Sequence, residues 1–592
     1  MTQRPRRGEG ARNRRANGAR RGGADHNRSS LSGSLGSRFA VLSEAMGSHR
    51  VAIVAVVFFI LAAVFFLRLF QLQVILHDDY SAKAEKSRSI EYPVQARRGT
   101  IYDRNGVVLA TSVESTTITC DPTKVTDASY AASKIAEILG GEAADYEKTL
   151  TADSTFGYIK RQVDVDVADQ LKSLNIVGLY FETEWRREYP NGAVGGQVVG
   201  YCNIDGEGIT GLELQYNDIL AGTDGYYKSE RGEDGMPIPD AVIENTPAVD
   251  GQDIMVSIDI KLQDSVEQAL AAGVEPLKAE GGSSVVMDAE TGEIYAVCSL
   301  PYMDPSNMSE SEVGSDTVKA ISEAFEPGSI FKSVSALAVL ESGVMTPEDT
   351  LFCPASIQAD EYTVSDAHER GDETMSLRQI LDNSSNVGIS LAVEKMGFDG
   401  LVEIINRYHL NEKTGVDYPG ESSGYMQDFN TWAKITGYNV SFGQGISCTP
   451  LQMTRFYAAV ANDGTMVTPH FLISLPQSGE RPTYETEQVD DNQAAIENLR
   501  SMMRTVVTEG TGKDAEIEGY DVVGKTSTAE IAEGGTYLKN VYNLCFTGFI
   551  DNSSSSLVCF VSASRVYGGG SVASIFNDIM SNAIEQYNIV PE

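Results

Sequence analysis

The segment Val51–Leu67 constrains this chain more than any other, because its seventeen consecutive residues carry no polar side chain. Leu69 and Phe70 extend it to about 20 residues, which as a helix rising ~1.5 Å per residue crosses the apolar core of a bilayer. A cleaved signal peptide is the alternative, but its apolar stretch is usually shorter and is followed by a small-residue cleavage site. Here RLFQLQVILHDDY follows instead. We therefore predict a single transmembrane anchor helix over residues 51–71.

The charge of the chain is divided between a basic head and an acidic body. Residues 1–50 hold eleven Arg against three acidic residues, a net charge of +8. Since the whole chain carries −37, the remainder carries −45. Arg clustered before a membrane span marks the cytoplasmic side, so we expect residues 1–50 in the cytoplasm and residues 72–592 outside the cell membrane. The acidic body argues against nucleic acid binding, and the Arg-, Gly- and Ser-rich head is predicted to be disordered.

Length and cysteine usage narrow the remaining possibilities. A chain of 592 residues is too long for one domain, and two or three large ones are expected. The seven Cys form no C-x-x-C pair and the six His are not at ligand spacing, so we expect no metal site and no cofactor. Cys298 and Cys559 lie in apolar runs, where cysteine is most often a small buried hydrophobe.

A change of character near residue 250 divides the exported part into two domains. Residues 72–250 show short apolar runs and many Gly turns, which indicate an elongated β-rich domain, here called the pedestal. Residues 251–592 contain a mostly helical middle region, 318–465, between two groups of strands. The predicted strands are 284–287, 294–298, 520–523, 545–550 and 557–562, and a helix over 572–587 follows them. Strands joined by short turns pair antiparallel, so we predict an α+β domain with a central antiparallel sheet flanked by helices.

The segment FEPGSIFKSVSALAVLESG, residues 325–343, is the sharpest local feature of the sequence. Pro327 and Gly328 predict a turn, and the apolar residues after them recur with helical spacing. Ser329 and Lys332 therefore share one face of the first helical turn. A lysine on an apolar helix loses hydration, its pKa falls, and the neutral amine can serve as the base that a serine nucleophile needs. Alternatively, Ser329 only caps the helix and Lys332 is a solvated first-turn residue.

Two further motifs follow in chain order. SSN occupies residues 384–386 in a helix–turn context, and VVGKTSTAE occupies residues 522–530 in a predicted strand. Ser-x-x-Lys, Ser-x-Asn and Lys-Thr-small, in this order, are typical of penicillin-binding proteins and serine β-lactamases. The chain also carries RRGTIYDRNG (97–106), REYPNG (187–192), GYCNIDGEGITGLE (200–213), TGVDYPGES (414–422) and SFGQGISCTPLQ (441–452). With these motifs it resembles the class B high-molecular-mass penicillin-binding proteins from the anchor to about residue 580.

The resemblance implies a pedestal, or dimerisation-like, domain followed by a penicillin-binding, serine β-lactamase-like D,D-transpeptidase domain. Such an enzyme cross-links peptidoglycan stem peptides through an acyl-serine intermediate and is inhibited by β-lactams. By motif position, Ser329 attacks the D-Ala–D-Ala bond and Lys332 takes its proton. Ser384 then relays protons to the leaving D-Ala, and Asn386 binds the substrate amide.

The third motif deviates from the family. The resemblance implies that Lys525 and Thr526 hold the terminal carboxylate of the substrate, and that the backbone N–H groups of Ser329 and Thr528 form the oxyanion hole. The family usually has Gly after the Lys-Thr pair, where this chain has Ser527. Because side chains alternate along a strand, Ser527 is predicted on the same face as Lys525. Its hydroxymethyl group should then narrow the substrate groove without closing it.

The pedestal motifs are expected to serve structure rather than chemistry. Arg97, Arg98, Asp103 and Arg104 offer charges for pairs that hold two domains together. Their glycines are predicted to be turn residues with positive φ: Gly99, Gly106, Gly206, Gly208 and Gly211.

Two other functions compete with the transpeptidase. A serine β-lactamase shares the first and third motifs, but it needs a base for deacylation, often the Glu of a Glu-x-x-Leu-Asn segment. No such segment occurs between residues 387 and 524. A catalytically inactive divisome scaffold should have lost Ser329, Lys332 or Lys525, and all three are present.

The resemblance also implies partners other than the stem peptides and the membrane. We expect a polytopic glycosyltransferase of the shape, elongation, division and sporulation family, with contacts through the anchor helix and the pedestal, and other divisome membrane proteins. The short Arg-rich head and the lack of a domain after residue 592 favour a role in septum formation over side-wall elongation.

Overall fold

A computed structural model describes residues 49–80, 83, 89–231, 237–534 and 536–592. Except for His49 and Arg50, the basic head predicted over residues 1–50 lies outside these described residues. The chain divides into two compact units. The first contains the N-terminal helix, with the chain up to Ile90 and Ser229–Ala241, and the second comprises Glu91–Lys228 and Val242–Glu592.

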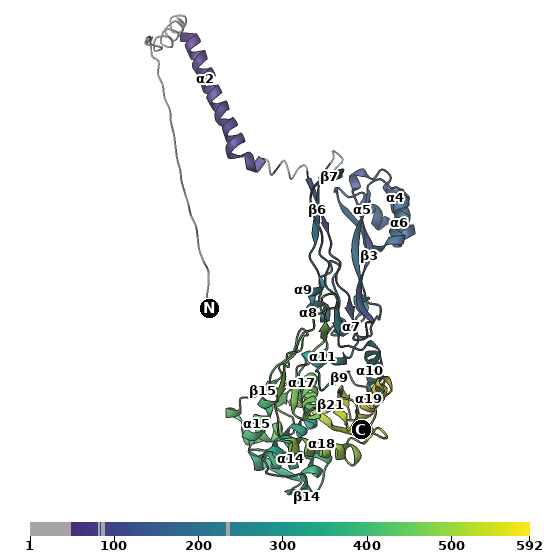
Figure 1. Ribbon diagram of the computed structural model, residues 1–592, viewed down its shortest axis with the longest axis vertical. Coiled ribbons are helices and arrows are strands. Elements are labelled where there is room, and N and C mark those ends of the chain that lie inside the picture. Colours follow the sequence, from purple (N-terminus) through teal and green to yellow (C-terminus); the bar gives the residue numbers. More distant parts are fainter. Residues whose placement is uncertain (1–48, 81–82, 84–88, 232–236, 535) are drawn as a thin grey trace, which may run out of the picture. The chain divides into compact units, whose positions relative to one another are not determined.

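The first unit holds the long apolar helix that the sequence predicts. Helix α2, His49–Phe70, continues into a π-helical turn, η1, Gln71–Ile75 (Figure 1). An 18-residue window within Val51–Ile75 has a mean hydropathy of 2.9, and among the described residues this is the one helix long and apolar enough to cross a membrane. Its large apolar side chains are exposed, Phe59 at 80%. An exposed apolar surface of this extent is typical of a segment that contacts lipid.

The pedestal is built on a long strand, β3, Val108–Cys120, which pairs antiparallel with β4 and β5. Helices α4 and α6 pack with this strand around Ile118, Ile135 and Leu171, which are fully buried. The other elements up to residue 256 are β1 Ser89–Val94, β2 Ile101–Tyr102, η2 Pro122–Lys124, α4 Ala128–Leu139, α5 Ala143–Leu150, β4 Gly157–Asp164, α6 Val165–Ser173, β5 Leu179–Glu188, α7 Gly196–Val199, α8 Gly211–Gln215, α9 Asn217–Leu220, β6 Gly225–Arg231, β7 Pro237–Thr246 and β8 Ile254–Val256.

Three of the pedestal motifs meet in one buried ion cluster. The fully buried carboxylate of Glu213 accepts hydrogen bonds from Arg98 Nε and Arg187 Nε, each at 2.6 Å. Arg98 also donates to Asn217 Oδ1 at 2.8 Å. Burial alone would raise the pKa of Glu213, but attraction by Arg187 and Arg98 outweighs it and the pKa is lowered. The charge of Arg98 is therefore paired within the pedestal, and not between two domains as the sequence predicts.

Other motif residues join the pedestal to the C-terminal domain. Arg104 Nη1 lies 3.1 Å from a carboxylate oxygen of Glu293, and Tyr418 donates to the carbonyl oxygen of Gln197 at 2.7 Å. Strand β2 pairs parallel with β8, so one sheet continues across the boundary predicted near residue 250. The expectation that paired charges hold the two domains together is confirmed at Arg104.

The motif glycines differ from the prediction at two positions. Three of the five have positive φ, as predicted, but Gly99 and Gly208 do not. A Cβ atom at Gly99 would lie 2.0 Å from the carbonyl oxygen of Gln252, and one at Gly208 would lie 2.0 Å from that of Glu213. The prediction was wrong there because close approach of a second backbone segment, not backbone conformation, requires these two glycines.

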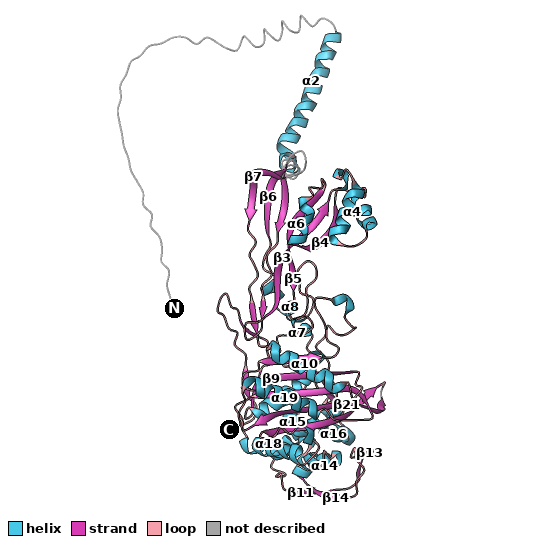
Figure 2. Cartoon of the chain, turned by 90° about the vertical axis from the view of Figure 1, so that its right-hand side faces the viewer, coloured by secondary structure: helices cyan, strands magenta, loops and turns pink. Residues whose placement is uncertain are grey.

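The C-terminal domain is organised around a five-stranded antiparallel sheet of order β10-β9-β22-β21-β20, so β20 lies at one edge. Its strands are β9 Gly281–Asp288, β10 Ile294–Ser299, β20 Asp521–Glu533, β21 Thr536–Asp551 and β22 Leu557–Tyr567. Helices cover both faces of the sheet (Figure 2), and every residue of β9 is buried as a result. The predicted α+β domain with a central antiparallel sheet is confirmed.

Alternate residues of the sheet point into two separate cores. Val285 and Met287 belong to the core on the side of α17, which also includes residues of α12, whereas Val286 belongs to the core on the side of α10, which also includes residues of α19. Cys298 and Cys559 are buried free thiols in the second core, as predicted. The helices and helical turns are α10 Ile260–Val274, η3 Met308–Glu310, α11 Lys319–Ser322, η4 Gly328–Phe331, α12 Lys332–Glu341, α13 Leu377–Asp382, α14 Asn386–Met396, α15 Phe398–Arg407, η5 Phe429–Thr431, α16 Lys434–Ser441, α17 Pro450–Ala461, α18 Gln493–Thr508, η6 Lys513–Ala515 and α19 Ala573–Tyr587.

The middle region, 318–465, is less helical than predicted. Short strands interrupt it and pair as β11 with β14, β12 with β13, and β15 with β16. They are β11 Thr350–Cys353, β12 Ser356–Ala359, β13 Tyr362–Ser365, β14 Glu373–Ser376, β15 Tyr425–Met426 and β16 Ile446–Ser447, and β17 Thr465–Val467, β18 Leu472–Ser474 and β19 Thr486–Gln488 follow. Strands of two to four residues are too short for hydrophobic alternation to reveal them.

Candidate active site

Ser329 lies in a tight turn that leads directly into a buried helix. The 3-10 turn η4 holds Ser329, which is half-buried, and continues as α12 from Lys332. Gly328 has a φ of +56°, a left-handed conformation that favours glycine. Its N–H donates to the carbonyl oxygen of Gly443 at 3.0 Å, which fixes the turn against the motif 441–452. The turn and helix predicted from the sequence are both present.

Lys332 is buried, with 1% of its surface exposed. Its Nζ donates to the Ser384 carbonyl oxygen at 2.5 Å and to Asn386 Oδ1 at 2.7 Å, and it lies 3.2 Å from Ser384 Oγ. The alternative that Lys332 is a solvated first-turn residue is therefore wrong. Burial, reinforced by the charge of Lys525, holds the pKa of Lys332 well below its usual value.

Ser384 occupies the turn between α13 and α14 in a left-handed conformation, with a φ of 55°. Such a conformation is uncommon for a residue with a side chain, and strained backbone of this kind clusters at functional sites. It leaves Ser384 Oγ between two lysines, 3.2 Å from Lys332 Nζ and 3.2 Å from Lys525 Nζ. All three motifs therefore meet at one hydroxyl group.

The third motif lies on β20, the edge strand. Lys525 is fully buried and donates to the Thr526 carbonyl oxygen at 3.1 Å as well as to Ser384. Burial lowers the pKa of Lys525 to about 7. Thr526 Oγ1 lies 2.6 Å from Thr511 Oγ1, and the exposed Thr528 pairs with Leu544 of β21.

Ser527 projects toward the Ser329 turn, on the same face of β20 as Lys525. Its side chain is buried, with 4% exposed. Ser527 Oγ accepts a hydrogen bond from the backbone N–H of Ser329 at 2.8 Å and donates to the Pro327 carbonyl oxygen at 2.8 Å. Hydrogen bonds therefore link Ser329, Lys332, Ser384, Asn386, Lys525 and Ser527 to one another or to the turn that holds them.

Comparison with known proteins now identifies the family. Residues 93–256 match the penicillin-binding protein dimerisation domain, and residues 282–581 match the penicillin-binding protein transpeptidase domain. The chain is 32% identical to the penicillin-binding protein PbpB of Mycolicibacterium smegmatis, covering 91% of this chain and 90% of the relative. The chain belongs to the class B penicillin-binding proteins.

This class B penicillin-binding protein is a serine-type peptidoglycan D,D-transpeptidase. It is 30% identical to the peptidoglycan D,D-transpeptidase FtsI of Escherichia coli, covering 88% of each chain. The crystal structure of penicillin-binding protein 3 from Mycobacterium tuberculosis complexed with aztreonam is 28% identical, with a TM-score of 0.66, and the match covers 84% of this chain and 98% of that one. The family, fold and enzyme class predicted from the sequence are confirmed.

The sequence did not predict a carboxylate that supports the second motif. Asp366 accepts hydrogen bonds from Ser385 Oγ at 2.8 Å and from Val387 N at 2.9 Å. Arg370 Nε pairs with Asp366 at 2.5 Å. The spacing of these two residues by four resembles a helical surface pair, and no local signal connects them to Ser385. In this penicillin-binding protein, Asp366 and Arg370 therefore contact the segment that contains Ser384 and Asn386.

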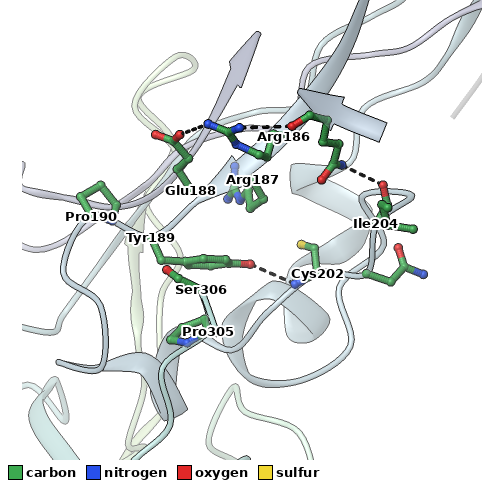
Figure 3. A pocket seen from close by; sticks show the side chains of 11 residues that line it. Arg186, Arg187, Glu188, Tyr189, Pro190, Cys202, Ile204, Pro305 and Ser306 are labelled. Atoms are coloured by element: carbon green, nitrogen blue, oxygen red, sulfur yellow. Dashed lines mark hydrogen bonds and ion pairs between the residues drawn. The ribbon is translucent and has the colours of Figure 1, made fainter. Parts of the chain in front are cut away.

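A separate cavity of about 630 Å³ lies between the pedestal and the loop that carries Pro305 and Ser306 (Figure 3). None of the predicted site residues lines it. Arg186 Nη2 there pairs with Glu188 at 2.7 Å, and the Tyr189 hydroxyl accepts the N–H of Cys202 at 2.9 Å. Arg187 also lines the cavity, and its buried Nη2 has no hydrogen-bond partner among the described residues. We assign no chemistry to this cavity.

Proposed function

We propose that the transpeptidase reaction takes place at Ser329, with Lys332 as the base. The convergence of two buried lysines on the Ser384 hydroxyl, beside the Ser329 turn, carries this proposal. A neutral lysine amine has two N–H donors and one lone pair. At Lys332 the donors are taken by the Ser384 carbonyl oxygen and Asn386 Oδ1. The lone pair is then left to accept a proton from a hydroxyl group.

In the proposed acylation, Ser329 Oγ forms a bond to the carbonyl carbon of the penultimate D-Ala of a stem peptide, and its proton passes to Lys332 Nζ. The N–H groups of Ser329 and Thr528 hold the oxyanion. When the oxyanion collapses, the peptide C–N bond breaks, and the proton reaches the leaving D-Ala through the Ser384 hydroxyl, 3.2 Å from Lys332. An amine of a neighbouring stem peptide then attacks the acyl ester and releases Ser329.

The position of β20 supports the proposed mode of substrate binding. An edge strand has one row of backbone N–H and C=O groups that can pair with an extended peptide. A stem peptide aligned along this edge would bring its terminal carboxylate to Lys525 and Thr526, and its amide to Asn386. Lys525 in its charged form attracts the carboxylate, and the Thr526 hydroxyl donates to it.

Asp366 is proposed as a positioning residue for the second motif. Its carboxylate binds the Ser385 hydroxyl and the Val387 N–H, the groups on either side of Asn386. Asn386 Nδ2 in turn donates to the Ser365 carbonyl oxygen at 3.1 Å. The segment Ser365–Asp366 therefore orients the Asn386 side chain. The Oδ1 atom of Asn386 accepts the hydrogen bond from Lys332 Nζ.

Acylation by penicillin tests the proposed site. The full-length protein in detergent should gain one covalent penicillin, mapped by mass spectrometry to the peptide that contains Ser329. The strained amide needs only the nucleophile, the base and the oxyanion hole for attack, whereas release needs an activated water, so the adduct should persist for many minutes. Ser329→Ala should gain none. Ser342→Ala, an exposed serine at the end of the same helix, is the matched control and should label like the wild type.

The outcomes separate the competing functions. An adduct on another residue would refute the assignment of Ser329. Rapid turnover of penicillin would favour a β-lactamase, and complete absence of an adduct would favour an inactive scaffold.

We further propose the membrane arrangement and domain limits predicted from the sequence: a cytoplasmic head over 1–50, an anchor over 51–71, a pedestal over 72–250 and a transpeptidase domain over 251–592. The exposed apolar helix supports the anchor. Protease added to intact protoplasts should remove the chain after about residue 75, and digestion of the head alone would reverse the orientation.

A septal role and partnership with a polytopic glycosyltransferase of the shape, elongation, division and sporulation family, through the anchor and the pedestal, are part of the same proposal. Similarity to FtsI of Escherichia coli supports the septal role. A fluorescent fusion should accumulate at septa, and uniform labelling of side walls would contradict the septal role.

A further inference from the structure

The backbone N–H of Ser329 already has a partner inside the protein. It donates to Ser527 Oγ at 2.8 Å, and the Ser527 hydroxyl donates its own proton to the Pro327 carbonyl oxygen at 2.8 Å. A serine hydroxyl has one proton to give. With that proton held by Pro327, Ser527 offers the Ser329 turn an acceptor and offers an incoming carbonyl oxygen no donor.

The packing of the turn against β20 keeps this hydroxyl in place. Ser527 is buried, and a Cβ atom at Gly328 would lie only 2.6 Å from Ser527 Oγ and 2.8 Å from Ala529 Cβ. The hydroxymethyl group thus fills the space between η4 and the edge strand. Glycine, which the family usually has at this position, would leave that space empty and the Ser329 N–H without this partner.

We propose that Ser527 is a resting-state cap on the oxyanion hole, a positioning residue that slows acylation by acting through the Ser329 amide. This inference rests on the proposed role of Ser329 as nucleophile and oxyanion-hole donor. One N–H cannot give a full hydrogen bond to two acceptors in different directions, so the carbonyl oxygen of an acyl donor must displace the Ser527 hydroxyl. The displacement costs part of the stabilisation that the oxyanion would otherwise gain.

The cost should fall on the acylation step more than on prior binding. The carboxylate of a β-lactam or stem peptide is assigned to Lys525 and Thr526, and neither contact requires the Ser527 hydroxyl to move. The carbonyl oxygen needs the Ser329 N–H most when negative charge develops on it. Removing the hydroxyl should therefore raise the maximal acylation rate constant while leaving the half-saturating concentration nearly constant.

The test measures acylation of the detergent-solubilised full chain by a fluorescent penicillin, as a function of penicillin concentration. Ser527→Ala removes the hydroxyl and keeps Cβ, and we expect the maximal rate constant to rise about two- to tenfold, the range of one hydrogen bond. Ser527→Gly should raise the maximal rate constant at least as much. Because glycine is the usual family residue at this position, this variant is expected to fold. Ser284→Ala is the matched control, since Ser284 is also buried in the sheet and donates to a carbonyl oxygen, that of Phe560.

The outcomes distinguish the cap from the proposed function itself. If the wild type is acylated at Ser329 but neither Ser527 variant is faster, the cap is refuted and the proposed site stands. If both variants are slower, the hydroxyl assists the oxyanion and the proposal is reversed. If Ser284→Ala is accelerated equally, the effect is a general loosening of the sheet. If the wild type gains no adduct at Ser329, the proposed function fails first.

Discussion

Buried cations occur in two regions of this molecule, and the two regions compensate their charge differently. In the pedestal, Arg98 and Arg187 both contact the carboxylate of Glu213 at 2.6 Å. In the candidate active site, the contacts described for Lys332 and Lys525 are to hydroxyl, amide and carbonyl oxygens. The pKa of Arg187 is raised, because attraction by Glu213 outweighs burial, whereas burial lowers the pKa values of both lysines.

The difference shows what pairing does to a buried charge. A carboxylate partner offsets the cost of desolvation and keeps the cation protonated. A protonated cation has no lone pair to accept a proton, so its role here is structural. Without that partner, desolvation favours the neutral amine, which has a lone pair and can accept a proton. This contrast can be tested by substitution and by pH, from the largest expected effect to the smallest.

Removing the base should have the largest effect. Lys332→Ala should slow penicillin acylation of Ser329 by ~10²-fold or more, the usual contribution of a positioned general base. The rate is measured with fluorescent penicillin on full-length protein, together with the melting temperature. Lys395→Ala, a lysine near the end of α14, is the control and should react like the wild type. A Lys332→Ala rate within threefold of the wild type would show that another group takes the proton.

Breaking the paired cluster should cost stability rather than chemistry. Glu213→Gln leaves Arg98 and Arg187 buried without a carboxylate, and we expect a loss of about 3–5 kcal/mol in the unfolding free energy of the pedestal. The chain has two Trp, so fluorescence of Trp185 in a Trp432→Phe background reports on the pedestal during urea unfolding. While it is folded, the variant should still be acylated by penicillin at the wild-type rate. Unchanged stability would mean that the cluster is not held together by charge.

The pH dependence of acylation should reveal Lys525. With a pKa of about 7, its protonated fraction falls about fivefold between pH 7 and pH 8, and the second-order acylation rate constant should fall with it as carboxylate attraction weakens. Lys525→Arg stays charged, so the fall should disappear. If the acylation rate constant of Lys525→Arg falls with the same pH midpoint, the titrating group is not Lys525.

The same group predicts the sign of a stability change. The pKa of Lys525 in the folded protein is lower than in the unfolded chain, so between about pH 7 and pH 10.5 the unfolded chain binds more protons. Lys525 therefore makes the folded state more stable as pH rises through that window.

A surface pair in the pedestal should show the smallest effect. Lys134 Nζ lies 2.6 Å from Glu137, with side chains 35% and 65% exposed. Lys134→Ala should leave the midpoint of urea unfolding, measured with Trp185, nearly unchanged, because solvent screens exposed pairs. A loss as large as that of Glu213→Gln would show that burial is not what distinguishes the cluster.

Local patterns explain which parts of this structure could be predicted. The strands of the central sheet could be predicted because apolar residues alternate within them and turn residues follow directly. The candidate active-site residues could be predicted because they lie in three short motifs that occur in a known order. Asp366 could not be found in this way, because its partners, Ser385 and Val387, are set by the folding of the β12–β13 hairpin against α14. The pairing of Arg98 with Glu213 joins two motifs that are distant in sequence, and only the tertiary structure shows that they share one charge cluster.

The place of β22 within the sheet ties the enzyme's maturation to the end of its synthesis. Strand β22 pairs with β9 through Leu557 and Asp288 and separates β9 from the β20–β21 hairpin. When the chain is made from its N-terminus, the Ser329 segment is synthesised long before this strand. Contacts between residues so far apart in sequence form slowly, since a long loop must close first. We therefore expect Lys525 to stay detached from the Ser329 turn until β22 inserts, so that a chain arrested before residue 557 would contain Ser329, the proposed nucleophile, without a complete candidate site.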